Sequence, residues 1–299
     1  MSELDRPPLW KVWLLAARPA TLPAGAAPVL AGCAIAFAHG ALVPTRALAA
    51  LAAALLVQIG TNLANDYFDF KKGADTEARV GPARASQRGW LPPAAVARGA
   101  ALALAGAGFA GLYLAYVGGW PVLAIAVISL VCAVAYTGGP YPLAYVGLGD
   151  VFVLVFFGPV AVAGTVYVNT LTWQADGVVA GLALGLLATA ILVVNNLRDR
   201  HTDAIVGKRT LAVRLGERFS RWQYAVAVLS AFALTTGWGL SIGHKGWLWP
   251  LVLLPMALLR VQQVWVADGT ALNPHLGTTG KLLFGFSVVL SAGLVLTIR

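Results

Sequence analysis

Long apolar runs recur along this chain, and they constrain its fold more than any other feature. A helix of about 20 apolar residues crosses a bilayer core of roughly 30 Å. Runs close to that length cover residues 20–38, 46–67, 94–116, 119–136, 150–168, 177–197, 222–241, 247–266 and 280–298. Only 11% of the 299 residues are charged, against about 25% in a soluble domain. The sequence therefore predicts an all-α polytopic membrane protein, with nine transmembrane helices bundled in the lipid bilayer as a single domain over residues 1–299.

The basic residues are divided unevenly between the two sides that these runs define. Sixteen lysines and arginines lie in the N-terminal segment and the even-numbered connections, and three lie on the other side. Loops rich in lysine and arginine stay in the cytoplasm. We therefore expect a multi-pass protein of the cell (inner) membrane with a cytoplasmic N-terminus and an outer C-terminus. A net charge of +9 would suggest nucleic acid in a soluble protein. Here the charge flanks apolar runs, so we expect no nucleic-acid partner.

The acidic residues gather in two connections on the same predicted cytoplasmic side. Seven of the twelve follow either the second run or the sixth: Asp66, Asp69, Asp75, Glu77, Asp199, Asp203 and Glu217. The segments NLANDYFDFKKGADTEAR and NNLRDRHTDAIVGKRTLAVR also share an order of asparagine, aspartates, glycine and lysine, then arginines. This similarity indicates a weak internal repeat.

The aspartates in each segment follow helical spacing. Residues three or four positions apart share one face of a helix, so each segment directs carboxylate and amide oxygens the same way. Oxygen ligands without His or Cys favour Mg²⁺ over Zn²⁺. Candidate metal ligands are Asp66, Asp69, Asp75, Asp199 and Asp203, and all except Asp75 are also candidate catalytic residues.

Amides and bases around these aspartates could bind an anionic group that shares the metal. Mg²⁺ commonly completes its coordination shell with substrate phosphate, which lysine and arginine also bind. The candidates of this kind are Asn62, Asn65, Lys71, Lys72, Arg79, Arg84, Asn195, Asn196, Lys208 and Arg209. The alternative is that the two segments are solvated loops whose bases follow the positive-inside rule and whose acids pair with them.

At these residues the sequence resembles the UbiA superfamily of intramembrane prenyltransferases. Asp199 and Asp203 match its second motif, DxxxD, and Asn65, Asp66 and Asp69 begin its first, NDxxDxxxD. Gly73 stands at the last position of the first motif, and Asp75 follows two residues later. The run NDYFDFKKGADTEARVGPARASQRG, with RPATLP, YTGGPYPLAYVGLGD and FGPVAVAGT, is similar to the subgroup that prenylates 1,4-dihydroxy-2-naphthoate in menaquinone synthesis.

This resemblance implies an Mg²⁺-dependent aromatic prenyltransferase. Its substrates would be a polyprenyl diphosphate and 1,4-dihydroxy-2-naphthoate. The product would be demethylmenaquinone, and diphosphate and CO₂ would be released. Tyr136 and Tyr141, in the connection between the fourth and fifth runs, are then candidates to stack on the naphthalene or to hydrogen-bond its hydroxyl. The alternative is that they belong to the aromatic belt at the membrane interface.

Two other functions remain open from the sequence. A related enzyme could use another aromatic acceptor, such as 4-hydroxybenzoate or homogentisate, although the KKGAD spacing argues against it. A secondary transporter would also combine nine helices, an internal repeat and charged sites. Its ionisable residues would lie near the bilayer midplane, whereas these lie at helix ends.

Overall fold

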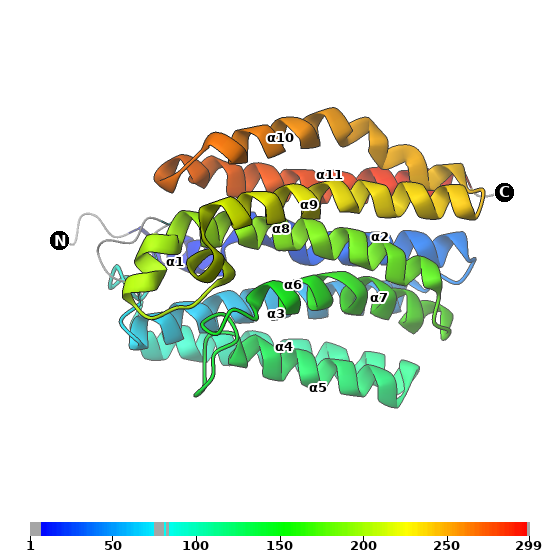
Figure 1. Ribbon diagram of the computed structural model, residues 1–299. Coiled ribbons are helices and arrows are strands. Elements are labelled where there is room, and N and C mark those ends of the chain that lie inside the picture. The colour runs from blue at the N-terminus through cyan, green and yellow to red at the C-terminus, as the bar shows by residue number, and fades with distance from the viewer. Residues whose placement is uncertain (1–6, 75–80, 82–83, 298–299) are drawn as a thin grey trace.

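The computed structural model describes residues 7–74, 81 and 84–297, and the elements in this part of the chain are helical. Most of the helices run side by side along one axis (Figure 1). Their bounds are α1 Leu9–Ala17, α2 Leu22–Ala38, α3 Pro44–Lys71, α4 Pro93–Gly118, α5 Trp120–Ala135, α6 Gly149–Val155, α7 Ala161–Thr170, α8 Ala175–Ile205, α9 Leu211–Ser241, α10 Leu254–Val266 and α11 Asn273–Leu296.

The predicted membrane-spanning architecture is confirmed. Within the described residues, eight helical stretches are long and apolar enough to cross a membrane, and the shorter α5 adds a ninth apolar pass. Proline stands in the first turn of α3, α4 and α5, where the missing amide hydrogen removes no helical hydrogen bond. The largest buried cluster joins side chains of α2, α7, α8, α9 and α11, with Leu184, Leu187 and Phe286 fully enclosed.

A separate helix, α1, precedes the first predicted span. Its Leu9 and Trp10 are exposed while Val12 and Ala16 are buried, so one face packs on the bundle and the other faces outward. The helix ends before Arg18, which has φ 53°, and Pro19 follows it. Proline cannot donate the next helical hydrogen bond, so the chain turns there into α2.

Two predicted spans differ in detail from the structure. The fifth run is not one regular helix: a wide π-type turn at Phe156–Val160 separates α6 from α7, with Gly158 outside helical φ/ψ. Pro159 accounts for the break because it lacks an amide hydrogen. The seventh span begins earlier than expected, since α9 starts at Leu211 and bends at Gly216, whose φ of 82° suits glycine.

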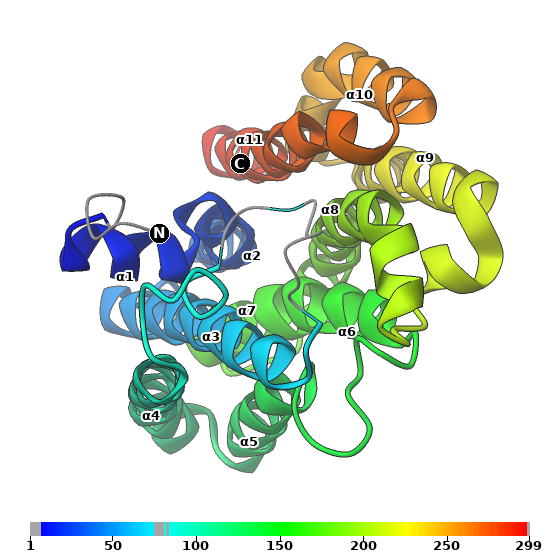
Figure 2. The same ribbon diagram turned by 90° about the vertical axis from the view of Figure 1, so that its left-hand side faces the viewer.

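Both acidic segments lie at one end of the bundle. α3 and α8 extend past their apolar runs, so Asp66 and Asp69 belong to the last turns of α3, and Asp199 and Asp203 to those of α8. The predicted helical spacing of both pairs is therefore confirmed. Figure 2 looks onto this end and shows α3 and α8 on either side of the bundle interior. The end of α11 lies at the opposite face (Figure 1), as an odd number of passes requires.

Candidate active site

A cavity of about 1020 Å³ opens between the two acidic segments and continues into the bundle. At the acidic end it is lined by Asp69, Asp199 and Asp203. Farther in, its walls are apolar. They reach Val122, near the start of α5, and Val168, near the end of α7, both far from the acidic end of the bundle. The cavity thus joins a charged mouth to a long apolar interior.

The first acidic segment presents Asp69 to this mouth. One carboxylate oxygen of Asp69 accepts a hydrogen bond from Arg84 Nη1 at 2.7 Å, and the other accepts one from Tyr145 Oη at 2.8 Å. Arg84 is 8% exposed and also donates to the backbone oxygen of Asn65 at 2.8 Å. A buried carboxylate is stable here because an arginine and a phenol both compensate its charge.

Asp66 is oriented differently from Asp69. Its two carboxylate oxygens accept backbone amides of the connection to α4, from Ala85 at 3.0 Å and Ser86 at 3.3 Å. The side chain is buried and is not part of the cavity wall. In this structure Asp66 therefore holds the connection against α3, and that connection places Arg84 on Asp69.

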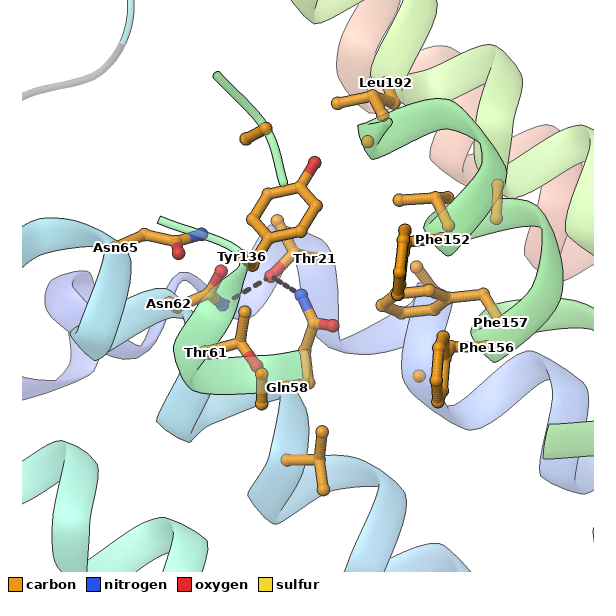
Figure 3. Close-up of a pocket in the computed structure, with 18 of the residues that line it drawn as sticks. Thr21, Gln58, Thr61, Asn62, Asn65, Tyr136, Phe152, Phe156, Phe157 and Leu192 are labelled. Carbon is orange, nitrogen blue, oxygen red and sulfur yellow. Dashed lines mark hydrogen bonds between the residues drawn. The ribbon is translucent and has the colours of Figure 1, made fainter. Parts of the chain in front are cut away.

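The amides of the first segment act as braces between elements. Asn62 donates to the Ala17 backbone oxygen at 3.0 Å, which satisfies a carbonyl left unpaired at the end of α1. It also donates to Thr21 Oγ1 at 2.9 Å, as does Gln58 at 3.1 Å (Figure 3). Asn65 accepts a hydrogen bond from the Thr137 hydroxyl at 2.8 Å. Asn62 and Asn65 both line the cavity.

In the second segment, Arg198 organises the side chains at the end of α8. Its guanidinium grips Asp199 with two hydrogen bonds of 2.7 and 2.6 Å, and it reaches Asn195 Oδ1 at 2.9 Å. It also donates to Asn273 Oδ1 at 3.1 Å, which ties α8 to α11. Bidentate arginine–carboxylate pairs hold both partners in a defined orientation. Asn195 and the buried Asn196 also line the cavity.

Asp203 has fewer partners. Its nearest base is Lys208, with Nζ 3.6 Å from Oδ1. Its Oδ2 is buried and has no hydrogen-bond partner among the described residues. A buried carboxylate oxygen without a partner is costly, which suits a position that receives a cation or a donor during function.

Tyr145 connects the two acidic segments. Its ring lies under Lys72 from α3, with Nζ 4.7 Å from the centroid, and under Lys208 from beyond α8, at 5.5 Å. Lys72 also donates to the Thr137 backbone oxygen at 2.7 Å. Partial burial lowers the pKa of Lys72, and the nearby Asp69 carboxylate opposes this shift. Two lysines from distant parts of the chain therefore meet beside Asp69.

Tyr136 and Tyr141 occupy different environments. Tyr136 lines the cavity and projects between the polar side chains of α3 and the ring of Phe152 (Figure 3). Burial, followed by the charges of Asp150, Asp69 and Asp203, raises the pKa of Tyr136, so its phenol stays protonated as a donor. Tyr141 is 80% exposed and is not part of the cavity wall.

The other predicted bases are divided between the mouth and the surface. Lys71 and Arg209 are exposed and are not part of the cavity wall, although the Arg209 backbone amide donates to Tyr145 O at 2.8 Å. Asp75 and Arg79 lie outside the described residues. Arg84 and Lys208 therefore line the mouth, and Lys72, which is exposed and outside the cavity wall, reaches it only through its contact with Tyr145. Lys71 and Arg209 stay at its edge.

The residues at the mouth fit a magnesium ion held together with a diphosphate. No three His, Cys, Asp or Glu side chains of the described chain form a ready metal cage. Mg²⁺ does not require one, since it binds one or two carboxylates and takes its other ligands from water and substrate phosphate. Asp69, Asp199 and Asp203 supply carboxylates on both sides of the mouth, and the unpartnered Asp203 Oδ2 supplies an available oxygen.

Sequence reasoning missed several residues that line the mouth or hold its side chains. Arg18, Arg198 and Asp150 line the cavity, and Tyr145 bonds to Asp69. In the sequence, Arg18 and Arg198 stand out only as basic residues of the predicted cytoplasmic side. Tyr145 and Asp150 lie in the stretch YTGGPYPLAYVGLGD. Neither the charges nor the residue spacing of this stretch marks a site.

The apolar interior of the cavity carries an aromatic wall. Phe152, Phe156 and Phe157 line it together (Figure 3), and the rings of Phe152 and Phe156 stack with centroids 5.8 Å apart. All three come from α6 and the wide turn after it, where the irregular backbone brings successive aromatic residues to the same space. Such a wall suits a long hydrocarbon chain and excludes water.

The fold and this site together define a membrane-embedded prenyltransferase: the chain belongs to the UbiA prenyltransferase family, whose profile matches residues 26–274. Two bacterial relatives carry the name 1,4-dihydroxy-2-naphthoate octaprenyltransferase. The one from Escherichia coli is 38% identical over 296 residues, and the one from Mycobacterium tuberculosis is 39% identical over 283 residues. Each alignment covers 94% of this chain and 96% of the relative.

A solved structure shows the same fold at low sequence identity. The UbiA homolog from Archaeoglobus fulgidus bound to DMAPP and Mg²⁺ superposes with a TM-score of 0.61 at 13% identity. The match covers 94% of this chain and 99% of that protein. The arrangement of helices in this chain is therefore shared with a protein of very different sequence.

Proposed function

We propose that this protein transfers a polyprenyl group from polyprenyl diphosphate to 1,4-dihydroxy-2-naphthoate, with loss of diphosphate and CO₂. The observation that carries the proposal is that one continuous cavity joins a mouth of aspartates and bases to an apolar interior. A prenyl diphosphate has the same division into a charged head and a long hydrocarbon tail. The names of the relatives at 38% and 39% identity support the naphthoate as acceptor.

The transfer balances without an added oxidant or proton donor. The allylic C–O bond breaks and its electron pair leaves with diphosphate, while a ring carbon supplies the pair for the new C–C bond. Loss of the ring carboxylate as CO₂ returns an electron pair to the ring. The product is demethylmenaquinone in its reduced, hydroquinone form, and no net proton is exchanged.

The side chains at the mouth have separate parts in this reaction. Asp69, Asp199 and Asp203 would hold Mg²⁺, which neutralises charge on the leaving diphosphate. Lys72, Lys208 and Arg84 add positive charge around the same group, and such charge acts most strongly where water is excluded. The aromatic wall of Phe152, Phe156 and Phe157 keeps water from the allylic cation that develops as the bond breaks.

Purified protein in detergent or nanodiscs tests the function directly. We expect Mg²⁺, polyprenyl diphosphate and 1,4-dihydroxy-2-naphthoate to yield a prenylated, decarboxylated naphthoquinol, identified by mass spectrometry, and EDTA to abolish it. Parallel reactions with 4-hydroxybenzoate and homogentisate test the other acceptors. Turnover of either acceptor in preference to the naphthoate would contradict the proposal.

Tyr136 should affect the acceptor more than the prenyl substrate. Its phenol is a protonated donor inside the cavity, so Tyr136→Phe removes a hydrogen bond to the acceptor while keeping the ring. We expect KM for the naphthoate to rise about 5- to 10-fold, the cost of one hydrogen bond, with KM for the prenyl diphosphate changed less than about 2-fold. Tyr141→Phe is the matched control, because Tyr141 is exposed outside the cavity. The reverse pattern of KM changes would place the acceptor elsewhere.

We further propose that the acidic end of the bundle faces the cytoplasm, as the distribution of lysine and arginine indicates. In a background with Cys33 and Cys132 replaced by serine, Arg88→Cys and Thr172→Cys place exposed thiols at opposite ends of the bundle. A membrane-impermeant maleimide applied to intact spheroplasts should label position 172 and spare position 88 until the membrane is opened. Labelling of position 88 in sealed spheroplasts would reverse the topology.

A further inference from the structure

A third carboxylate, Asp150, lines the cavity away from both acidic segments. It stands at the start of α6 and is only 6% exposed, although its side chain reaches the cavity wall. None of the ion pairs found among the described residues includes it. Carboxylates buried in a membrane protein without a basic partner are costly and are retained mainly for function.

One oxygen of this carboxylate is held in place. Gln223, on α9, donates from Nε2 to Asp150 Oδ1 at 2.9 Å. A glutamine amide orients the carboxylate without neutralising it, so the negative charge remains available to the cavity. Phe152, two residues farther along α6, and Leu192 give the same cavity an aromatic and apolar wall (Figure 3).

The phenol of Tyr136 lies close to the backbone at the start of α6, where Asp150 stands. A Cβ built on Gly149, the residue before Asp150, would lie 3.1 Å from the Tyr136 hydroxyl oxygen. Glycine at position 149 therefore leaves room for that hydroxyl beside the start of α6. The cavity wall here combines one hydrogen-bond donor, one charged acceptor and an aromatic ring, which is the complement of a hydroxylated aromatic molecule.

We propose that Asp150 binds the aromatic acceptor by accepting a hydrogen bond from one of its ring hydroxyls, an inference that rests on the proposed function. Hydrogen bonds to a carboxylate are short and about twice as strong as neutral ones. This bond increases electron density in the ring, which strengthens its attack on the allylic carbon. The same charge repels the acceptor's own carboxylate and turns it toward Lys208, which lines the cavity.

Asp150→Asn tests the charge while keeping the shape. Asparagine still offers Gln223 an acceptor oxygen, so the structural hydrogen bond survives. We expect kcat/KM for 1,4-dihydroxy-2-naphthoate to fall about 10- to 100-fold, as expected for a hydrogen bond to a charged group. KM for the prenyl diphosphate should change less than about 2-fold, because Asp150 faces the acceptor. Wild-type activity in the variant, or an equal loss of affinity for both substrates, would overturn the inference.

Two inhibitors that each lack one ring hydroxyl show whether the contact is direct. Inhibition constants of 1-hydroxy-2-naphthoate and 4-hydroxy-2-naphthoate are measured for the wild type and for Asp150→Asn. The inhibitor without the hydroxyl that meets Asp150 should bind both proteins alike, and the other should lose affinity in the variant. Equal losses for both inhibitors would indicate a structural role for Asp150 and would overturn the direct contact.

Two controls separate the possible failures. If Asp150→Asn does not give a monodisperse protein in detergent, Gln223→Met removes the positioning donor, and its inhibitor pattern must show the same selectivity, at smaller amplitude, for the inference to stand. A wild-type protein that does not turn over the naphthoate contradicts the proposed function. A wild-type protein that does so, with Asp150→Asn unaffected, contradicts only this inference.

Discussion

Asp203→Asn is expected to lower kcat about 100-fold or more, the range found when an electrostatic stabiliser of the transition state is removed. Asp203 lines the cavity, and its buried Oδ2 has no hydrogen-bond partner among the described residues. Asparagine preserves the size of the side chain but removes the charge that would hold Mg²⁺ and, through it, the diphosphate. The measurement is steady-state kinetics over a range of Mg²⁺ concentrations, in which the variant should need more Mg²⁺ for half-maximal activity.

Asp176→Asn provides a matched control on the same helix. Asp176 begins the other end of α8, where its carboxylate accepts hydrogen bonds from Trp238 at 2.7 Å and contacts His39 at 3.1 Å. This substitution also removes one charge from α8, but far from the mouth, so kcat and the Mg²⁺ dependence should stay near wild type. An Asp203→Asn variant with normal turnover, or one that matches Asp176→Asn, would contradict the assignment of Asp203 to the metal.

Gly185→Ala is expected to destabilise the fold, although alanine is the better helix former. A Cβ at Gly185 on α8 would lie against the backbone oxygen of Leu154 on α6, closer than atoms can approach, and 3.0 Å from Gly158 Cα. The neighbouring atoms are backbone, so the helices must separate. Overpacking of this kind costs about 1–3 kcal/mol. Thermal unfolding in detergent should show a lower midpoint and, because α6 carries Asp150 and Phe152, reduced activity.

Gly237→Ala reverses the sign of this effect. Gly237 lies within α9 on the exposed surface, and a Cβ there meets nothing within 4 Å. Alanine should therefore stabilise α9 by up to about 1 kcal/mol through helix propensity alone. Equal stabilisation of both variants would contradict the close packing of α8 against α6 at Gly185.

The membrane architecture and the location of the polar site could be predicted from the sequence because both depend on local composition. An apolar run of about 20 residues has to satisfy its own backbone hydrogen bonds in lipid, so it becomes a helix whatever surrounds it. The charged residues follow the second and the sixth apolar runs. An even number of membrane crossings separates these two positions, so both groups of charges must lie at the same membrane face. The five aspartates predicted in this way include Asp69, Asp199 and Asp203, which line the cavity.

Which residues face the cavity was decided only by tertiary packing. Asp66 and Asp69 are three residues apart, and helical spacing alone places both on one face, yet the connection to α4 engages Asp66 while Asp69 meets Arg84 and Tyr145. From the sequence, Tyr136 and Tyr141 are equal candidates to contact the acceptor, but of the two only Tyr136 lines the cavity. These differences arise from contacts between residues distant in sequence, which periodicity does not encode.

The sequence by itself determined that this chain is a polytopic helical membrane protein that gathers acids and bases at one end of the bundle. Those properties follow from hydrophobic run length and charge placement, which act over a few helical turns. The tertiary structure alone decided how the mouth is assembled: Lys72 and Lys208 meet across Tyr145, Arg198 grips Asp199, and Asp150 reaches the cavity from α6. The sequence around Asp150 shows no motif, so its proposed role depends on the side chains that other helices place around it.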